Sequence, residues 1–370
     1  MIHIAVIGCG YWGPNLIRNF SALPDCTVTH VCDLDAARLA RAKALYPHLR
    51  TTSRASEILD NPRIDAVAIA TPVATHFELG ARSLTAGKHT LIEKPLATSV
   101  EHCQQLIRLA EQQQRVLMVG HTFLYSTAVE KIKQLVDAGD LGEILYISSQ
   151  RLNLGLFQTD INVTWDLAPH DLSILLHLLG CKPVSVNCQG KAHVHPQIED
   201  VTNMSLSFPR GTFAMIQSSW LDPSKVRRMT VVGSRKMVLY DDTEPLEKVK
   251  IYDKRVEVPP HYDSYAEFHY SYHYGDMYVP HLKQVEPLKA ECQDFLKAIR
   301  TGEPPRVTGQ QGLAVVAILQ AADHSLRHGG IPVELTDPLV VNSYGGACLA
   351  AATGSTEQSV TSAPPLSPTV

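Results

Sequence analysis

The 370-residue sequence lacks several features that would assign it to a specialised class of protein. Its eight cysteines include no Cys-x-x-Cys pair, which argues against a zinc cluster or a disulfide framework and favours reduced, mostly buried thiols. No hydrophobic run approaches the length of a membrane span, and the chain does not start with a basic segment followed by a long apolar stretch. We therefore expect a cytoplasmic protein without a membrane partner.

Positive charge is not in excess either. The net charge is -4, aromatic residues make up only 6%, and no basic stripe is interleaved with aromatics, so a nucleic-acid partner is not expected. Hydrophobic residues make up 45% and charged residues 19%, which is ordinary for a globular protein. Because the chain is longer than the length at which a single hydrophobic core usually stops growing, we expect two domains.

The first residues contain a glycine-rich turn in a specific setting. An apolar run over 2–7 predicts a strand, and Gly8-Cys9-Gly10-Tyr11-Trp12-Gly13 follows it, before a stretch of helix formers. A second apolar run ends at Asp33, twenty positions after the third glycine. Strand, glycine turn, helix and acidic residue in this order are typical of a dinucleotide-binding site. The alternative is a glycine-rich turn that binds no ligand.

Each residue of this turn has an expected role. Gly8 permits the tight turn, Gly10 lets backbone N–H groups approach a pyrophosphate, and Gly13 allows close packing of the helix. The helix N-terminus adds partial positive charge for the phosphates. Asp33 is placed to accept hydrogen bonds from the ribose hydroxyls and to repel a 2′-phosphate, which favours NAD over NADP.

The pattern of apolar residues changes along the chain. Up to about residue 120, short β-branched runs alternate with helical patterns, which predicts a doubly wound parallel sheet in a domain over 1–121. Longer alternating strands follow, which predict an α+β domain with an open, mostly antiparallel sheet over 122–338. The expected strands there are 144–151, 184–190, 201–208, 212–219, 228–232 and 236–240, and the expected helices are 167–179, 286–300 and 309–327. Residues 339–370 form a tail, expected to be disordered from Tyr344 to Val370.

Two expected strands of the first domain end in polar motifs. Thr71-Pro72 and His76 follow one strand, and Glu93-Lys94-Pro95 follows the next. Doubly wound folds place ligands at the carboxyl ends of their strands. An X-Pro bond can be cis, which could turn the Lys94 amine toward a cofactor. The alternative is that Lys94 is a solvated surface group.

A further motif lies in the second domain, where Asp166 and His170 stand four residues apart. If a helix begins near Asp166, the two side chains share one face. Histidine is suited to proton abstraction near neutral pH, and the carboxylate can orient it or bind the same substrate. The alternative is that Asp166 is an N-cap and His170 a structural histidine.

Together, the glycine turn, Glu93-Lys94-Pro95 and the Asp166-x-x-x-His170 pair resemble the Gfo/Idh/MocA family of nicotinamide-dependent sugar and cyclitol oxidoreductases. The resemblance covers roughly 1–338 and implies that Lys94, Asp166 and His170 are catalytic. The expected NAD-binding residues are Gly8, Gly10, Tyr11, Trp12, Gly13, Asp33, Thr71, Pro72, His76, Glu93 and Lys94. The expected substrate-binding residues are Lys94, Arg151, Asp166 and His170.

Some longer strings, among them Trp165 to Asp171 and Glu286-Pro287-Leu288, resemble the nucleotide-sugar 3-dehydrogenase branch of that family. This implies hydride transfer from C3 of UDP-N-acetylglucosamine or its uronic acid. The alternatives are an inositol or simple-sugar dehydrogenase, a sugar 3-ketoreductase of a natural-product pathway, and a non-catalytic NAD-binding regulator. A charged nucleotide-sugar also needs cations, for which the candidates are Arg151, Lys191, Arg227 and Arg228.

One segment departs from the branch. Residues 261–281 are rich in Tyr and contain four histidines, His261, His269, His273 and His281. We interpret the segment as a loop over the substrate or a subunit contact rather than a metal site, since a lysine and a histidine suffice for the alcohol proton. An open sheet in the second domain would leave an apolar face, so we expect a homodimer or homotetramer.

Overall fold

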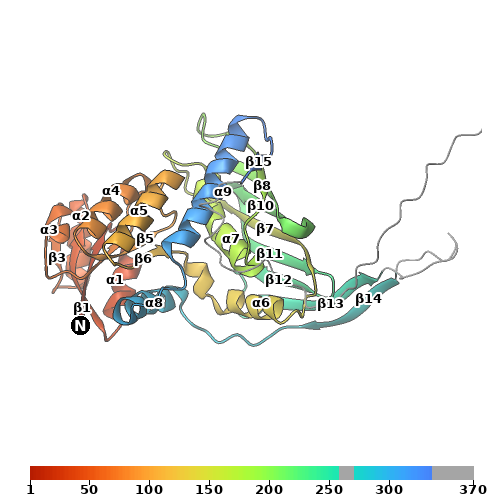
Figure 1. The fold of residues 1–370 in the computed structure, drawn as a ribbon, viewed down its shortest axis with the longest axis horizontal. Coiled ribbons are helices and arrows are strands. Elements are labelled where there is room, and N and C mark those ends of the chain that lie inside the picture. The colour runs from red at the N-terminus through yellow and green to blue at the C-terminus, as the bar shows by residue number, and fades with distance from the viewer. Residues whose placement is uncertain (258–270, 336–370) are drawn as a thin grey trace, which may run out of the picture.

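The computed structural model describes residues 1–257 and 271–335. Two sheets dominate it, one in each half of the described chain, with helices around and between them (Figure 1). The predicted tail over 339–370 lies outside the described residues. Within the described ranges, no helix combines the length and the apolar character needed to cross a bilayer.

The first sheet is parallel throughout, with the strand order β3-β2-β1-β4-β5-β6. Its strands are β1 (Ile2–Ile7), β2 (Cys26–Cys32), β3 (Arg50–Thr52), β4 (Ala66–Ile69), β5 (His89–Glu93) and β6 (Leu117–Gly120). Its helices are α1 (Gly13–Ser21), α2 (Ala36–Leu45), α3 (Ser56–Leu59), α4 (His76–Thr85) and α5 (Val100–Gln112), with the 3-10 turn η1 (Val73–Thr75). Strands β4 and β6 are buried at every residue, as expected where helices cover both faces of a parallel sheet. The predicted doubly wound sheet is confirmed.

The second sheet is open, with the order β14-β13-β12-β11-β7-β10-β9-β8-β15. Its strands are β7 (Ile144–Leu154), β8 (Ser185–Lys191), β9 (Val201–Ser207), β10 (Phe213–Ser219), β11 (Leu221–Gly233), β12 (Met237–Asp241), β13 (Val249–Glu257), β14 (Ser271–Tyr278) and β15 (Val333–Glu334). Strands β7 and β10 pair in parallel, and the other pairs among the described strands are antiparallel. The predicted open, mostly antiparallel sheet is therefore also confirmed.

The remaining helices follow the first sheet in the chain. They are η2 (Thr122–Tyr125), α6 (Thr127–Asp137), α7 (Val163–Leu179), η3 (Pro209–Gly211), α8 (Pro287–Thr301) and α9 (Gly309–Arg327). Helix α7 packs on β7, β9 and β10, while α9 contacts α5 and β6 of the first sheet and β8 of the second (Figure 1). Helix α8 returns to pack against α1. This arrangement brings Lys94, at the end of β5, into contact with Asp166 near the start of α7.

The Tyr- and His-rich segment differs from expectation in its described part. Residues Ser271–Tyr278 form β14, which pairs with β13 and places Tyr274 opposite Lys254. The prediction of a loop is wrong for these residues, because the alternation of Tyr272 and Tyr274 with smaller or polar residues suits a strand. His273 lies on this strand, with its Nε2 3.0 Å from Asp253 Oδ2. His261 and His269 lie outside the described residues.

Candidate active site

The glycine turn adopts a geometry that only glycine tolerates at two positions. Gly8 has a φ of +101°, and a Cβ there would lie 2.4 Å from the Ala70 carbonyl oxygen. A Cβ at Gly13 would lie 2.0 Å from the Gly8 carbonyl oxygen, so α1 packs directly on the turn. Beside Gly10, by contrast, the nearest atom to a Cβ would be Arg38 Nη1 at 3.8 Å. The backbone at Gly10 is thus open to a close-lying ligand, which fits a dinucleotide cradle.

Asp33 follows β2 and holds this turn. Its Oδ2 accepts a hydrogen bond of 2.5 Å from the N–H of Cys9, and its Oδ1 accepts one of 2.9 Å from the N–H of Asp35. The side chain is only 8% exposed, and Arg38 Nη1 lies 3.8 Å from Oδ2. The carboxylate therefore combines a structural role in the turn with a position beside an exposed cation.

The ends of β4 and β5 are joined through His76. Its Nε2 lies 2.8 Å from the Thr71 carbonyl oxygen and its Nδ1 lies 2.8 Å from that of Pro95. The ring is 1% exposed, and burial lowers the pKa of His76. His76 is thus placed to support the loops at Thr71-Pro72 and Lys94-Pro95 from behind. Glu93 is buried in the same way, and its burial raises its pKa to about 7.

Lys94 reaches from the end of β5 to the start of α7. Its Nζ donates a hydrogen bond of 2.7 Å to the carbonyl oxygen of Asp166 and lies 3.6 Å from Asp166 Oδ1. The side chain is 12% exposed, and the Lys94–Pro95 peptide bond is cis. Trp220 Nε1 donates to the other carboxylate oxygen, Asp166 Oδ2, at 3.0 Å. The solvated-surface interpretation of Lys94 does not hold.

Helix α7 carries Asp166 and His170 on adjacent turns. The helix begins at Val163, because the Asn162 side chain caps it by accepting from the N–H of Trp165 at 3.2 Å. Asp166 therefore lies in the first turn, and its alternative role as the N-cap is wrong. The spacing of four residues puts Asp166 and His170 on one face of the helix.

His170 packs against Phe123, with ring centroids 4.8 Å apart. Its Nδ1 has no hydrogen-bond partner among the described residues. Burial lowers the pKa of His170 well below its usual value, and the positive charge of Lys94 adds to this shift. The imidazole is therefore neutral at neutral pH, which is the form that can accept a proton.

A cleft of about 1020 Å³ connects the glycine turn with His170. Tyr11, Trp12, Phe123 and His170 line it, together with Arg227. The Tyr11 ring is 82% exposed and stands edge-on to Trp12, with centroids 5.6 Å apart. The structure thus brings the predicted cofactor turn and the predicted catalytic helix to one cavity. In the described part of the chain, no group of three or more His, Cys, Asp or Glu side chains is placed to hold a metal ion.

Arg151 does not reach this cleft as a free cation. Its Nε donates to Asp171 Oδ2 at 2.6 Å and its Nη2 donates to Asp171 Oδ1 at 3.2 Å. Both side chains are buried, and the guanidinium lies 4.7 Å from the Phe123 ring centroid. The structure therefore places Arg151 in a buried ion pair beneath Phe123. A direct contact between Arg151 and a substrate stays a prediction.

Several residues of the site were not predicted from the sequence. Trp220 contacts Asp166, Phe123 contacts His170, and Lys248 lines the cleft. His121 is buried near Lys94, and burial lowers the pKa of His121 to about 3. None of them belongs to a spaced motif. Only an aromatic residue next to a predicted strand end could have indicated Phe123.

Known proteins match this chain along most of its described length. Residues 2–121 match the family described as "Oxidoreductase family, NAD-binding Rossmann fold", and residues 129–239 match the "GFO/IDH/MocA C-terminal domain". UDP-N-acetylglucosamine 3-dehydrogenase of Acidithiobacillus ferrooxidans is 29% identical over 320 residues, which cover 86% of this chain and 95% of that protein. A solved structure of that enzyme has a TM-score of 0.73 at 28% identity, covering 89% of this chain and 99% of the other.

Other relatives have different names. Myo-inositol 2-dehydrogenase of Thermotoga maritima is 24% identical over 336 residues, covering 88% of this chain and 96% of that protein. The structure of GenD2 from gentamicin A biosynthesis, in complex with NAD, has a TM-score of 0.76 at 23% identity, covering 91% of this chain and 97% of the other. At that identity the likeness shows a shared fold.

Proposed function

Because the chain belongs to the Gfo/Idh/MocA family and is an NAD-binding oxidoreductase of CH–OH groups, we propose that its substrate is a nucleotide-linked sugar oxidised at C3. UDP-N-acetylglucosamine and its uronic acid are the first candidates. The observation that supports a catalytic site most directly is the contact between Lys94 and Asp166 on the helix face of His170. Lys94 and Asp166 come from two distant segments, and His170, one helical turn beyond Asp166, lines a cleft large enough for a sugar.

The glycine turn fits NAD, since the tight backbone at Gly8 and Gly13 has no room for a Cβ atom and the backbone at Gly10 is open to a ligand. Bound NAD supplies the carbon that accepts the hydride. We assign the pyrophosphate to the turn, the adenosine ribose to Asp33, and the nicotinamide end to Thr71, Pro72 and Lys94. The aromatic rings of Tyr11 and Trp12 line the cleft beside the turn. His76 and Glu93 support these contacts from buried positions.

His170, Lys94 and Asp166 have different roles when the substrate hydroxyl loses its proton. His170, which lines the cleft and is neutral because of its lowered pKa, takes the hydroxyl proton at an unprotonated ring nitrogen. Lys94 donates a hydrogen bond to the oxygen as negative charge develops on it. Asp166, fixed by Trp220, holds the Lys94 ammonium and is placed to bind the sugar. The same groups serve the reverse reduction, so a 3-ketoreductase remains an alternative direction.

A second candidate is an inositol dehydrogenase, because such enzymes also match along most of the chain. The two candidates are separated by adding UDP-N-acetylglucosamine, its uronic acid, dTDP-ketosugars and inositols to the purified protein and recording NADH absorbance. Tightly bound cofactor is measured in the same samples, since it would mask turnover with added NAD. We expect NADH formation with the UDP-sugars. Turnover of myo-inositol with inert UDP-sugars would contradict the proposal, and binding of NAD without any turnover would favour a regulator.

We also propose that the protein is a homo-oligomer that packs through the open second sheet. Strands β7 and β10 lie at the centre of this sheet and expose Tyr146, Phe213 and Met215. Apolar groups gathered on one exposed face are common at subunit contacts.

A further inference from the structure

We infer that Arg227 and Lys248 form a subsite for an anionic group of the substrate, either a phosphate of a nucleoside diphosphate or a carboxylate of a uronic acid. The inference rests on the proposed function, because it names the part of the substrate that lies beyond the reacting hydroxyl. It also ranks the basic residues that the sequence leaves as equal candidates.

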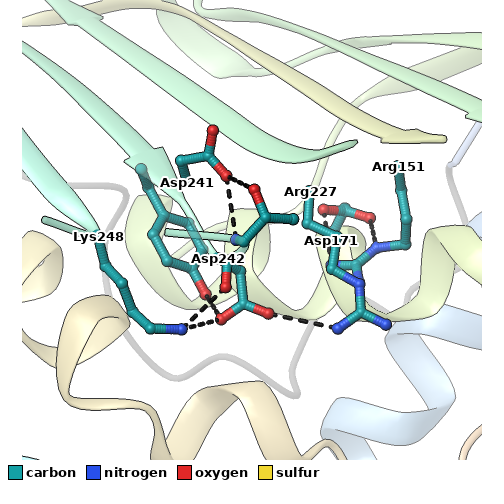
Figure 2. Close-up of polar contacts among 8 residues, drawn as sticks. Arg151, Asp171, Arg227, Asp241, Asp242 and Lys248 are labelled. Carbon is teal, nitrogen blue, oxygen red and sulfur yellow. Dashed lines mark hydrogen bonds and ion pairs between the residues drawn. The ribbon is translucent and has the colours of Figure 1, made fainter. Parts of the chain in front are cut away.

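The first argument is charge. Lys248 Nζ lies 2.7 Å from Asp242 Oδ1 and also donates to the Asp242 carbonyl oxygen at 2.9 Å. Arg227 Nη1 donates to Asp242 Oδ2 at 3.4 Å, so two cations reach one carboxylate from opposite sides (Figure 2). The Tyr240 hydroxyl also donates to Asp242 Oδ1, at 3.2 Å. Arg227, Lys248 and Asp242 together therefore have a net charge of +1. Asp242 also holds both cations in position before any ligand binds.

The second argument is position. Arg227, Asp242 and Lys248 line the same cleft as His170. The side chains of Arg227 and Lys248 are 38% and 31% exposed, so their donors are accessible without being free in solvent. The charge of Arg227 also acts on the imidazole of His170. A substrate with its hydroxyl at His170 could thus place an anionic group against Arg227 and Lys248.

The other three cations that the sequence offers as candidates are already neutralised or lie elsewhere. Arg151 is paired with Asp171 and buried beside this cluster (Figure 2). Arg228 follows Arg227 on β11, so its side chain points to the opposite face of the sheet, where it pairs with Asp241 at 3.0 Å. Lys191 lies on β8, which three strands separate from β11. Neither Arg228 nor Lys191 lines the cleft.

This charge distribution favours one class of substrate. A neutral cyclitol has no group that would replace the water around Arg227 and Lys248 with an ionic contact. A nucleotide-sugar or a uronic acid has such a group, and hydrogen bonds between charged partners are stronger than neutral ones. The subsite therefore supports an anionic sugar over an inositol as the substrate.

The test uses two simple anionic probes. One lacks the sugar that the enzyme would oxidise, and the other carries a carboxylate as its only anionic group. UDP serves as the phosphate probe and glucuronate as the carboxylate probe, both titrated by calorimetry into the NAD-saturated full-length protein. The variants are Arg227→Gln and Lys248→Met, and the matched control is Arg228→Gln. Circular dichroism and NAD affinity check that each variant is folded. We expect UDP to bind about tenfold more weakly to each cleft variant, and to bind the control as it binds the wild type.

The outcomes separate the ligand sources and the two proposals. Loss of UDP affinity identifies a phosphate subsite, and loss of glucuronate affinity alone identifies a carboxylate subsite. If neither probe binds the wild type, or if both cleft variants bind both probes as the wild type does, the subsite is refuted. Oxidation of UDP-N-acetylglucosamine with an unchanged KM in these variants would refute the subsite and leave the proposed function intact. If UDP binding depends on Arg227 and Lys248 but no UDP-sugar is turned over, the subsite is supported and the proposed function is refuted.

Discussion

His170 is either a catalytic base or a structural histidine, and the two roles predict different effects of a substitution on turnover and stability. As a base it acts mainly in the transition state, whereas as a core histidine it would contribute packing and hydrogen bonds. Its ring lines the cleft and its Nδ1 has no partner among the described residues, which is unusual for a purely structural histidine. The geometry therefore favours the role of a base.

We predict that His170→Asn and Lys94→Met fold, bind NAD and lose about a hundredfold or more in turnover. The reason is that proton removal and stabilisation of the developing alkoxide both disappear. Melting temperature, NAD affinity and kcat should be measured on the same preparations. His177→Asn is the matched control, since His177 lies on the same helix but does not line the cleft. A folded His170→Asn enzyme with nearly native turnover would refute the mechanism.

Asp33 gives a second prediction at this scale. If the adenosine ribose binds at Asp33 as proposed, the carboxylate repels a 2′-phosphate, and the wild type should bind NAD at least about tenfold more tightly than NADP, or roughly 1.4 kcal/mol. In Asp33→Ser the repulsion is lost and the neighbouring Arg38, 3.8 Å away, becomes available to a phosphate. The preference for NAD should therefore narrow.

Titration calorimetry with both dinucleotides measures this preference. Adding Arg38→Gln to Asp33→Ser should weaken NADP binding again, while both variants lose some NAD affinity because Asp33 also holds the N–H of Cys9. Equal affinities of the wild type for NAD and NADP would remove the proposed role of Asp33.

At the scale of elements, local signals account for what could be predicted from the sequence. Helix α9 spans the predicted 309–327 because Thr308 and Gln311 form a capping box at its start. Strand β3 has three residues, and helix α3 is a single turn, so neither gives a periodic pattern long enough to recognise. Helix α7 begins earlier than predicted because the cap is Asn162.

Contacts between distant segments could not be predicted in this way. The motif residues Lys94, Asp166 and His170 are visible in the sequence because each has a fixed spacing to its neighbours. The pairing of β7 with β10, which sets Ile147 beside Ala214, depends on the packing of the whole second sheet. The contact of Trp220 with Asp166 has the same origin. Supporting residues of the site therefore emerge only from the structure.

The packing of α8 against the first domain gives a prediction about pH. Burial raises the pKa of Glu291, on α8, well above its usual value, and the nearby Glu93 carboxylate adds to the shift. In the unfolded chain this carboxyl ionises near pH 4.5, while in the native state it stays protonated to higher pH. Below about pH 4.5 the carboxyl is protonated in both the folded and the unfolded state, so its ionisation does not lower the free energy of unfolding. As pH rises above it, the unfolded state loses its proton first, so the free energy of unfolding falls.

We therefore predict that Glu291→Gln removes this loss of stability. The melting temperature of the variant minus that of the wild type should become more positive as pH rises from 5 to 8. Glu303→Gln is the control, because Glu303 is exposed and pairs with Lys297 at 2.9 Å. Thermal denaturation at several pH values measures both differences. A difference for Glu291→Gln that is constant or decreases with pH would contradict the assigned burial effect.

At the scale of the whole molecule, the open face of the second sheet is the feature that the described chain leaves uncovered. Buried residues such as Ile147 and Ala214 face the helices, and the alternate positions on the same strands face outward. Among these, Phe213 pairs directly with Tyr146, and Met215 follows two residues later. Their exposed fractions of 37–39% contrast with the full burial of their neighbours.

We predict that the wild type sediments as a dimer, or as a tetramer of two such dimers, and that Phe213→Glu with Met215→Glu converts it to smaller species at micromolar concentration. Two carboxylates at the centre of the face would lose their hydration on association and would repel their symmetry mates across a closed contact. Leu45→Glu is the matched control, since Leu45 is 64% exposed on α2 of the first domain, away from this sheet. Analytical ultracentrifugation of the three proteins gives the measurement. A wild-type protein that is a stable monomer at micromolar concentration would refute the assembly, and an assembly that withstands both substitutions would place the contact on another surface.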